Sequence, residues 1–60
     1  MSVHRKIEKY LRHTGMPMTK FGRLAVNDPR LVQDLRNGRE LRSATAARIE
    51  AFLVEMGAPQ

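Results

Sequence analysis

The sequence contains no cysteine and no tryptophan, and it has only one tyrosine and two phenylalanines. Without cysteine a chain can form neither disulfides nor a thiolate zinc site, and two histidines alone make a poor metal cage. No apolar run approaches the roughly 18 residues of a membrane span, and the N-terminus MSVHRKIEKY lacks the apolar core of a secretory signal. We therefore expect a cytoplasmic protein that holds no metal or cofactor and makes no membrane contact.

Acidic residues are also scarce. Six Asp and Glu stand against 11 Lys and Arg, and residues 1–24 alone carry six basic side chains and one acidic side chain. A net charge of +5 attracts polyanions. At 60 residues the chain is one small domain, 1–60, whose burial of apolar surface barely offsets its conformational entropy. We therefore expect dimerisation or ligand binding to add stability.

No segment alternates apolar and polar residues with period two, so the sequence predicts no sheet. Apolar residues instead recur at helical spacing, which predicts an all-α fold of four helices over about 3–14, 17–26, 29–37 and 43–56. The residues predicted to face the core are Val3, Ile7, Tyr10, Leu11, Thr14, Met18, Phe21, Ala25, Leu31, Val32, Leu35, Thr45, Ile49, Phe52, Leu53 and Met56.

The boundary between the second and third helices is the sharpest local signal. Asn27 tolerates the left-handed conformation that ends a helix, Asp28 is a strong N-cap, and Pro29 suits a first helical position. Asn37 and Gly38 form a natural helix end, and a Ser at position 43 predicts the cap of the fourth helix.

Two short helices joined by a tight turn form a helix-turn-helix arrangement, and the chain fits its packing rules. Gly22 lies where the two helices cross closely, a position that we expect to need Gly or Ala. With Met18 as the first motif position, the fourth, eighth, fifteenth and eighteenth positions must be apolar. They are occupied by Phe21, Ala25, Val32 and Leu35.

These residues resemble the lambda-repressor-like helix-turn-helix regulators of bacteria and phages, of the xenobiotic-response-element type in its compact form. The resemblance covers about residues 17–53 and implies a repressor or autoregulator that occupies a short palindromic DNA operator at the nucleoid. The segments that carry it are Thr19-Lys20-Phe21-Gly22, Asp28-Pro29-Arg30, Asn37-Gly38-Arg39 and Thr45-Ala46-Ala47-Arg48-Ile49.

The third helix presents polar side chains opposite its apolar face. Arg can fork onto guanine, Gln and Asn can pair with adenine, and Asp can accept from the cytosine amino group or instead orient Arg30. The residues predicted to read bases are Pro29, Arg30, Gln33, Asp34 and Asn37. Those predicted to hold phosphates are Thr19, Lys20, Arg23, Arg36, Arg39 and Arg42, with solubility charges as the alternative for the basic ones.

The fourth helix has a second apolar stripe, Ala47, Ala51, Val54 and Ala58. It predicts either the contact of a homodimer, with two recognition helices about one turn of DNA apart, or only the high helix propensity of Ala. His4 and His13 are about 180° apart on a helix and so cannot share a metal. The methionines Met16, Met18 and Met56 are predicted to fill the core.

Ser2, Thr14, Asp34 and Ser43 show no spacing of nucleophile, base and orienting group, so we expect no enzyme. No polar cluster suggests a pocket for a small ligand. Two other functions remain open: an interaction module or antitoxin-like adaptor that binds an acidic protein, and an RNA-binding or non-specific nucleic-acid-binding protein.

Overall fold

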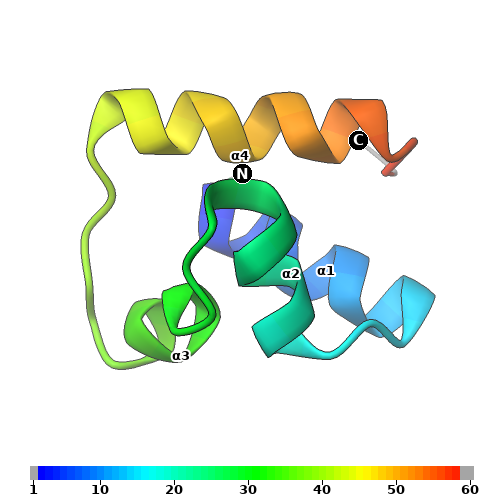
Figure 1. Ribbon diagram of the computed structural model, residues 1–60, viewed down its shortest axis with the longest axis horizontal. Helices are drawn as coiled ribbons and strands as arrows, with labels where there is room; N and C mark the ends of the chain where they lie inside the picture. Colours follow the sequence, from blue (N-terminus) through cyan, green and yellow to red (C-terminus); the bar gives the residue numbers. More distant parts are fainter. Residues whose placement is uncertain (1, 59–60) are drawn as a thin grey trace.

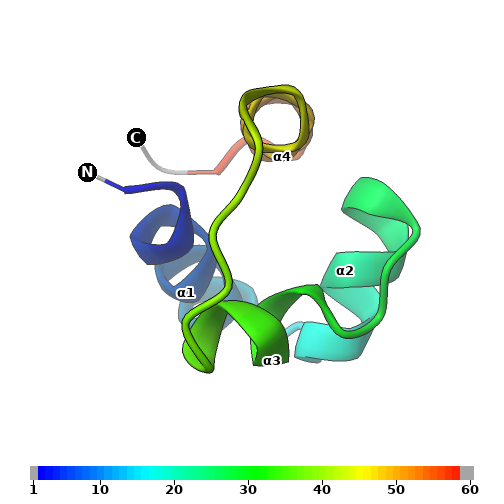
Figure 2. The ribbon, with the colours of Figure 1, turned by 90° about the vertical axis from the view of Figure 1, so that its left-hand side faces the viewer.

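The computed structural model describes residues 2–58, which form four helices joined by short loops and contain no strand. The helices are α1 (Val3–Thr14), α2 (Met18–Val26), α3 (Leu31–Arg36) and α4 (Ser43–Glu55). Figures 1 and 2 show α3 and α4 on opposite sides of the molecule, with α1 and α2 between them. The predicted all-α class is confirmed. No helix in this part of the chain is long and apolar enough to cross a membrane.

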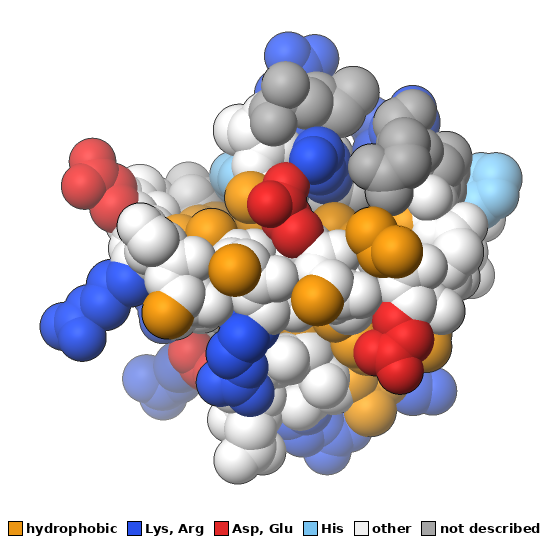
Figure 3. All heavy atoms as spheres, turned by 90° about the horizontal axis from the view of Figure 1, so that it is seen from above, with side chains coloured by type: hydrophobic (Ala, Val, Ile, Leu, Met, Phe, Trp, Pro, Cys, Tyr) orange, Lys and Arg blue, Asp and Glu red, His pale blue; other side chains and the backbone are white. Residues whose placement is uncertain are grey.

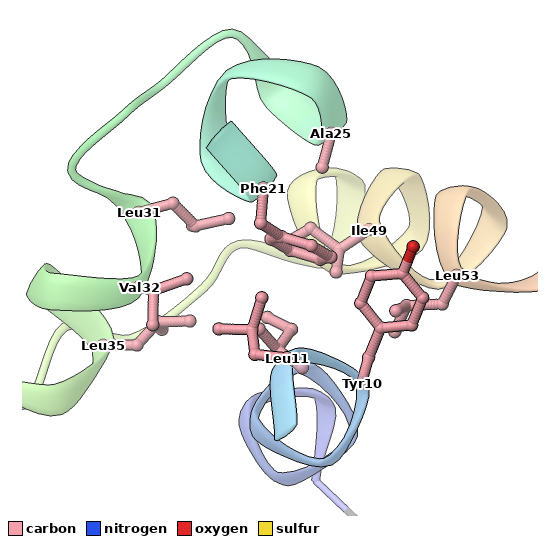
Figure 4. Close-up of a cluster of buried hydrophobic side chains, with 10 residues drawn as sticks. Tyr10, Leu11, Phe21, Ala25, Leu31, Val32, Leu35, Ile49 and Leu53 are labelled. Carbon is pink, nitrogen blue, oxygen red and sulfur yellow. The ribbon is translucent and has the colours of Figure 1, made fainter. Parts of the chain in front are cut away.

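The buried side chains form one cluster to which all four helices contribute. Phe21 is fully buried at its centre, where its ring lies 5.8 Å from that of Tyr10 and 5.4 Å from that of Phe52. Both ring pairs are inclined, at 55° and 81°, as aromatic quadrupoles favour. Figure 4 shows the side chains of α3 and α4 pointing into this cluster from its two sides. Each helix therefore turns its outer face to solvent.

The predicted breaks between helices are largely confirmed. Helix α1 has the predicted bounds, and α2 begins one residue later than predicted, with Pro17 as its N-cap. Asn27 ends α2 with φ 56°, the left-handed conformation expected of it. Gly38 follows α3 with φ 100°, and the next backbone N–H, that of Arg39, donates to the Asp34 carbonyl in a Schellman closure.

The start of α3 and the cap of α4 were predicted wrongly, although α4 begins at residue 43 as predicted. Helix α3 begins at Leu31 and not at 29, because Asp28 closes a turn over Pro29 and Arg30 before the helix begins. Helix α4 has Arg42 as its extended N-cap residue, so Ser43 is already helical and makes no capping bond. Helix α4 also ends at Glu55, one residue early, and α3 ends at Arg36.

Three predictions about apolar faces need correction. Met16 and Met18 pack against the core as expected, but Met56 is 47% exposed because it lies beyond the end of α4. Thr14 is exposed at the end of α1, where its hydroxyl donates to the Tyr10 carbonyl. Ala58 packs against the core, since the chain leaves the helical path at Gly57 (φ 70°), and it is not part of an outer stripe of α4.

Candidate nucleic-acid interface

Gly22 fixes the approach of α2 to the chain that enters α3. A Cβ atom at this position would overlap the carbonyl oxygen of Asp28 and lie 3.2 Å from the Cβ of Leu31. The Gly22 carbonyl also accepts a hydrogen bond from the Asp28 backbone N–H, at 3.0 Å. The sequence suggested that Gly or Ala would fit here. The structure corrects this, because even the methyl group of Ala would collide with backbone that cannot rotate away.

Asp28 organises the turn before α3. Its carbonyl accepts from the Leu31 N–H at 3.2 Å, and its Oδ1 accepts from the Arg30 N–H at 3.0 Å. The carboxylate therefore takes up an otherwise unpaired amide, as predicted, but within a turn and not in a helix. As a consequence Pro29 and Arg30 stand just ahead of α3 and not on its first turn.

The outer surface of this region consists mainly of polar side chains that point away from the core. Leu31, Val32 and Leu35 are buried, so the opposite side of the segment faces solvent. We call this side the α3 surface; its exposed members are Pro29, Arg30, Gln33 and Asn37. Asp34, the fifth residue predicted to read bases, is half-buried beside them.

Arg39 joins two carboxylates at the edge of the α3 surface. Its Nη1 atom lies 2.9 Å from Oδ2 of Asp28 and 3.3 Å from Oδ2 of Asp34. The hydrogen bond from Arg39, followed by that from the Arg30 N–H, holds the pKa of the Asp28 carboxyl below its ordinary value. Asp34 thus pairs with Arg39 and not with Arg30. Arg39 therefore connects the turn before α3 to the loop after it.

A second ion pair attaches the end of α3 to α1. Arg36 donates to both carboxylate oxygens of Glu8 at 2.8 Å, in the bidentate geometry that suits a guanidinium. His4 approaches the same carboxylate at 2.9 Å. The bonds from Arg36, opposed by burial and assisted by His4, lower the pKa of Glu8 from 4.5 to about 2. This pair could not be predicted from the sequence, because 28 residues separate its members.

Arg36 and Arg39 were both predicted to hold phosphates, and both are engaged with carboxylates. Arg42 is the N-cap of α4, which begins on the side of the molecule opposite α3. It therefore lies away from the α3 surface, which weakens the prediction that it holds a phosphate beside the bases. Thr19, Lys20 and Arg23 are exposed on α2, the helix that packs against α3.

Most of the remaining cations have no carboxylate within reach. Lys6 is an exception, because its Nζ lies 2.7 Å from Oε1 of Glu50 and so joins α1 to α4. Within residues 2–58, the basic side chains without an ion-pair partner are Arg5, Lys9, Arg12, Lys20, Arg23, Arg30, Arg42 and Arg48. Most of the positive charge is therefore not neutralised by ion pairs within the described chain.

Two of the unpaired arginines, Arg5 and Arg12, line a shallow pocket of about 270 Å³ on α1. It is lined by His4, Arg5, Glu8 and Arg12. Because Glu8 also binds Arg36, the pocket lies beside the end of α3. None of these four residues was among those predicted from the sequence to contact DNA. The seven-residue spacing of Arg5 and Arg12, which places both on one side of a helix, is the signal that could have found it.

No group of three His, Asp or Glu residues in the described part of the chain could hold a metal ion. His4 is taken up by Glu8, and His13 is exposed near the end of α1. The carboxylates of Glu8, Asp28 and Asp34 are each held by an arginine.

Ala47, Ala51 and Val54 are exposed along the outer side of α4. Figure 3, which looks down onto this helix, shows small hydrophobic side chains in a row with acidic and basic side chains beside them. The row lies on the side of the molecule opposite α3.

Comparison with known proteins adds no family assignment: no family model, no curated protein and no solved structure matches this chain.

Proposed function

We propose that this protein binds double-stranded DNA through the α3 surface, as a helix-turn-helix regulator of the lambda-repressor-like type that occupies an operator. The observation that carries the proposal is the contact of Gly22 with Asp28 and Leu31, which sets a short helix against α2 with its polar side outward. Lys20 and Arg23 on α2 and Arg30 just before α3 form no ion pair within the described chain, so their charges are available to a polyanion.

The roles within the α3 surface follow from side-chain chemistry. Arg30 can fork onto the O6 and N7 atoms of guanine, and the amides of Gln33 and Asn37 can pair with adenine. Pro29 offers an apolar contact to a thymine methyl group. Asp34 does not read cytosine in this proposal, since its carboxylate pairs with Arg39; it helps to hold the backbone of the reading segment.

The phosphate contacts come from the neighbouring segments. Thr19, Lys20 and Arg23 extend from α2, which crosses the DNA backbone while α3 enters the major groove. The pocket formed by Arg5 and Arg12 on α1 takes a further phosphate beyond the end of α3. In this arrangement Arg36 and Arg39 act by positioning α3, and the protein works at the bacterial nucleoid without a cofactor.

A selection from random duplex DNA tests the proposal. We expect it to return a short preferred site whose affinity exceeds that of a scrambled duplex by about 1,000-fold or more. An RNA duplex of the same sequence should bind weakly, because its deep, narrow major groove excludes a reading helix.

Two results would contradict the proposal. Equal affinity for selected, scrambled and RNA duplexes, with one common salt dependence, would indicate a non-specific nucleic-acid binder. No duplex binding at low salt would favour a module that recognises an acidic protein.

A further inference from the structure

The outer side of α4 combines small side chains with two charges that have no partner in the described chain. Ala47, Ala51 and Val54 follow one another at spacings of four and three residues, and Val54 is 65% exposed. Arg48 and Glu55, one heptad apart, are both exposed along one edge of this row and form no ion pair within residues 2–58. We call these five residues the α4 surface.

The α4 surface is complementary to itself in one orientation. If two copies of α4 pack antiparallel around a two-fold axis at Ala51, the residues before Ala51 in one copy face those after it in the other. Arg48 then faces Glu55 of the second copy, and the reverse pair forms at the other end. Val54 packs over Ala47 in the same way, so that a larger side chain meets a smaller one.

The parallel arrangement lacks both features. There each residue lies level with its own copy, and the edge that carries Arg48 and Glu55 faces the edge that carries Val54. The charge pattern therefore identifies the occupant of the α4 surface as a second copy of this chain, in antiparallel orientation. An isologous contact of this kind is the commonest basis of soluble homodimers.

The placement of α3 has a consequence for such a dimer. Helices α3 and α4 bury their inner sides in the same core and lie on opposite sides of the molecule, so their outer sides point in opposite directions (Figure 2). A two-fold axis within the α4 interface reverses every direction perpendicular to that interface. The two α3 surfaces of the dimer therefore face away from each other.

The separation of the two α3 surfaces would not by itself rule out one operator. The Cα atoms span 24 × 21 × 20 Å, so two stacked protomers hold their α3 helices roughly 40 Å apart, close to the half-site spacing of about 34–36 Å. Direction decides the matter, because two surfaces that point away from each other cannot enter the same side of one straight duplex.

We propose that the α4 surface forms an antiparallel homodimer that joins two separate DNA duplexes, one at each α3 surface. This rests on the proposed function for the DNA-binding step alone. It replaces the expectation, taken from the sequence, that an α4 dimer would place two recognition helices one turn apart on a palindrome. A contact built from one helix per protomer is small, so the dimer forms weakly and in a concentration-dependent way.

Sedimentation over a concentration series and a two-duplex capture assay test the proposal together. In the capture assay, one mixed-sequence duplex is attached to beads and a second, labelled duplex is free. We expect the protein to form dimers at high concentration and to bring labelled DNA to the beads over the same concentration range. The bead-bound duplex alone measures DNA binding independently of the bridge.

Ala51→Glu separates the two steps, because the axis would bring two carboxylates together at the centre of the contact. We expect dimerisation to weaken by about 100-fold and capture to disappear, while affinity for a single duplex changes by less than about twofold. Ser43→Glu is the matched control: it adds the same charge to an exposed position two turns away on α4, and we expect capture to persist.

A charge exchange tests the orientation without depending on how Ala51→Glu folds. Arg48→Glu should weaken capture by about tenfold, and the double variant Arg48→Glu, Glu55→Arg should restore it. The inference is overturned if the double variant stays as weak as the single one, if Ala51→Glu sediments like the parent, or if two protomers occupy one duplex without capture. If the parent protein does not bind a single duplex at all, the proposed function is overturned instead.

Discussion

The α3 surface and the α4 surface are both exposed outer sides of helices, but the protein holds them in different ways. Around α3, three contacts fix the backbone: Gly22 against Asp28, Arg39 between Asp28 and Asp34, and Arg36 against Glu8. The outer side of α4 makes no ion pair within the described chain, although Lys6 binds Glu50 at its flank. The α3 surface carries long polar side chains, whereas the α4 surface carries mainly small ones.

The difference is consistent with the role proposed for each surface. Hydrogen bonds to base edges require donor and acceptor positions that are fixed to a fraction of an ångström, so the helix that presents them must be held on several sides. A contact between small side chains requires only close approach of two backbones. Disturbing the contacts of α3 should therefore affect DNA recognition, while leaving self-association intact wherever the fold survives.

The largest effect is expected at Gly22. Gly22→Leu forces the backbone of Asp28 away from α2, because no side-chain rotation can relieve that overlap. We expect a loss of about 3 kcal/mol in the free energy of unfolding and a fall of more than about 10 °C in melting temperature. Gly57→Leu is the control: its φ of 70° is unfavourable for Leu, but nothing lies within 4 Å of an added Cβ, so the expected loss is about 1 kcal/mol. Equal melting temperatures for the two variants would remove Gly22 as the crossing point.

A smaller effect is expected at Glu8, and it depends on pH. Its carboxyl pKa is about 2 in the folded protein against an ordinary 4.5, so the ion pair stabilises the fold above pH 4.5 and loses its effect as pH falls toward 2. Glu8→Gln should cost about 1 kcal/mol or less near pH 7. The stability difference between the parent and the variant should shrink between about pH 4.5 and 2. A difference that stays constant over this range would show that Glu8 is not paired.

These two sites differ in how far the sequence could predict them. Gly22 and Asn27 act through their own backbone conformation and sterics, which local sequence specifies, so the crossing and the helix end could be predicted. The pairing of Arg36 with Glu8 depends on how α1 and α3 meet in space. For the same reason the position of Arg42, at the far end of a loop, did not follow from its nearness to α3 in sequence.

The start of α3 falls between these cases. The pattern Asn27-Asp28-Pro29 correctly predicted a break followed by a capping carboxylate, but not that Asp28 would close a turn over Pro29 and Arg30 first. Both outcomes satisfy the same amides, so local sequence does not distinguish them. The apolar positions of α3 were predicted correctly, because burial of Leu31, Val32 and Leu35 requires the same spacing in either case.

The smallest effect is expected at Arg39. Arg39→Ala leaves the carboxylates of Asp28 and Asp34 without their cation at the edge of the α3 surface. We expect DNA affinity to fall about threefold at low salt and less at high salt, because the added repulsion is screened. Arg39→Lys keeps the charge and should recover most of the affinity. If Arg39→Lys were as weak as Arg39→Ala, the geometry of the guanidinium between the two carboxylates, and not its charge, would be what matters.

The most direct test of the central claim, that the α3 surface reads base sequence, compares Arg30→Ala with Lys20→Ala on the selected duplex and on random DNA at two salt concentrations. Arg30→Ala should cost about 1–3 kcal/mol on the selected site and much less on random DNA, and Gln33→Ala should behave in the same way. Lys20→Ala should weaken both DNAs alike and reduce the salt slope by about one unit. If Arg30→Ala weakened both DNAs equally, Arg30 would be binding phosphate, and the claim of direct base reading would be contradicted.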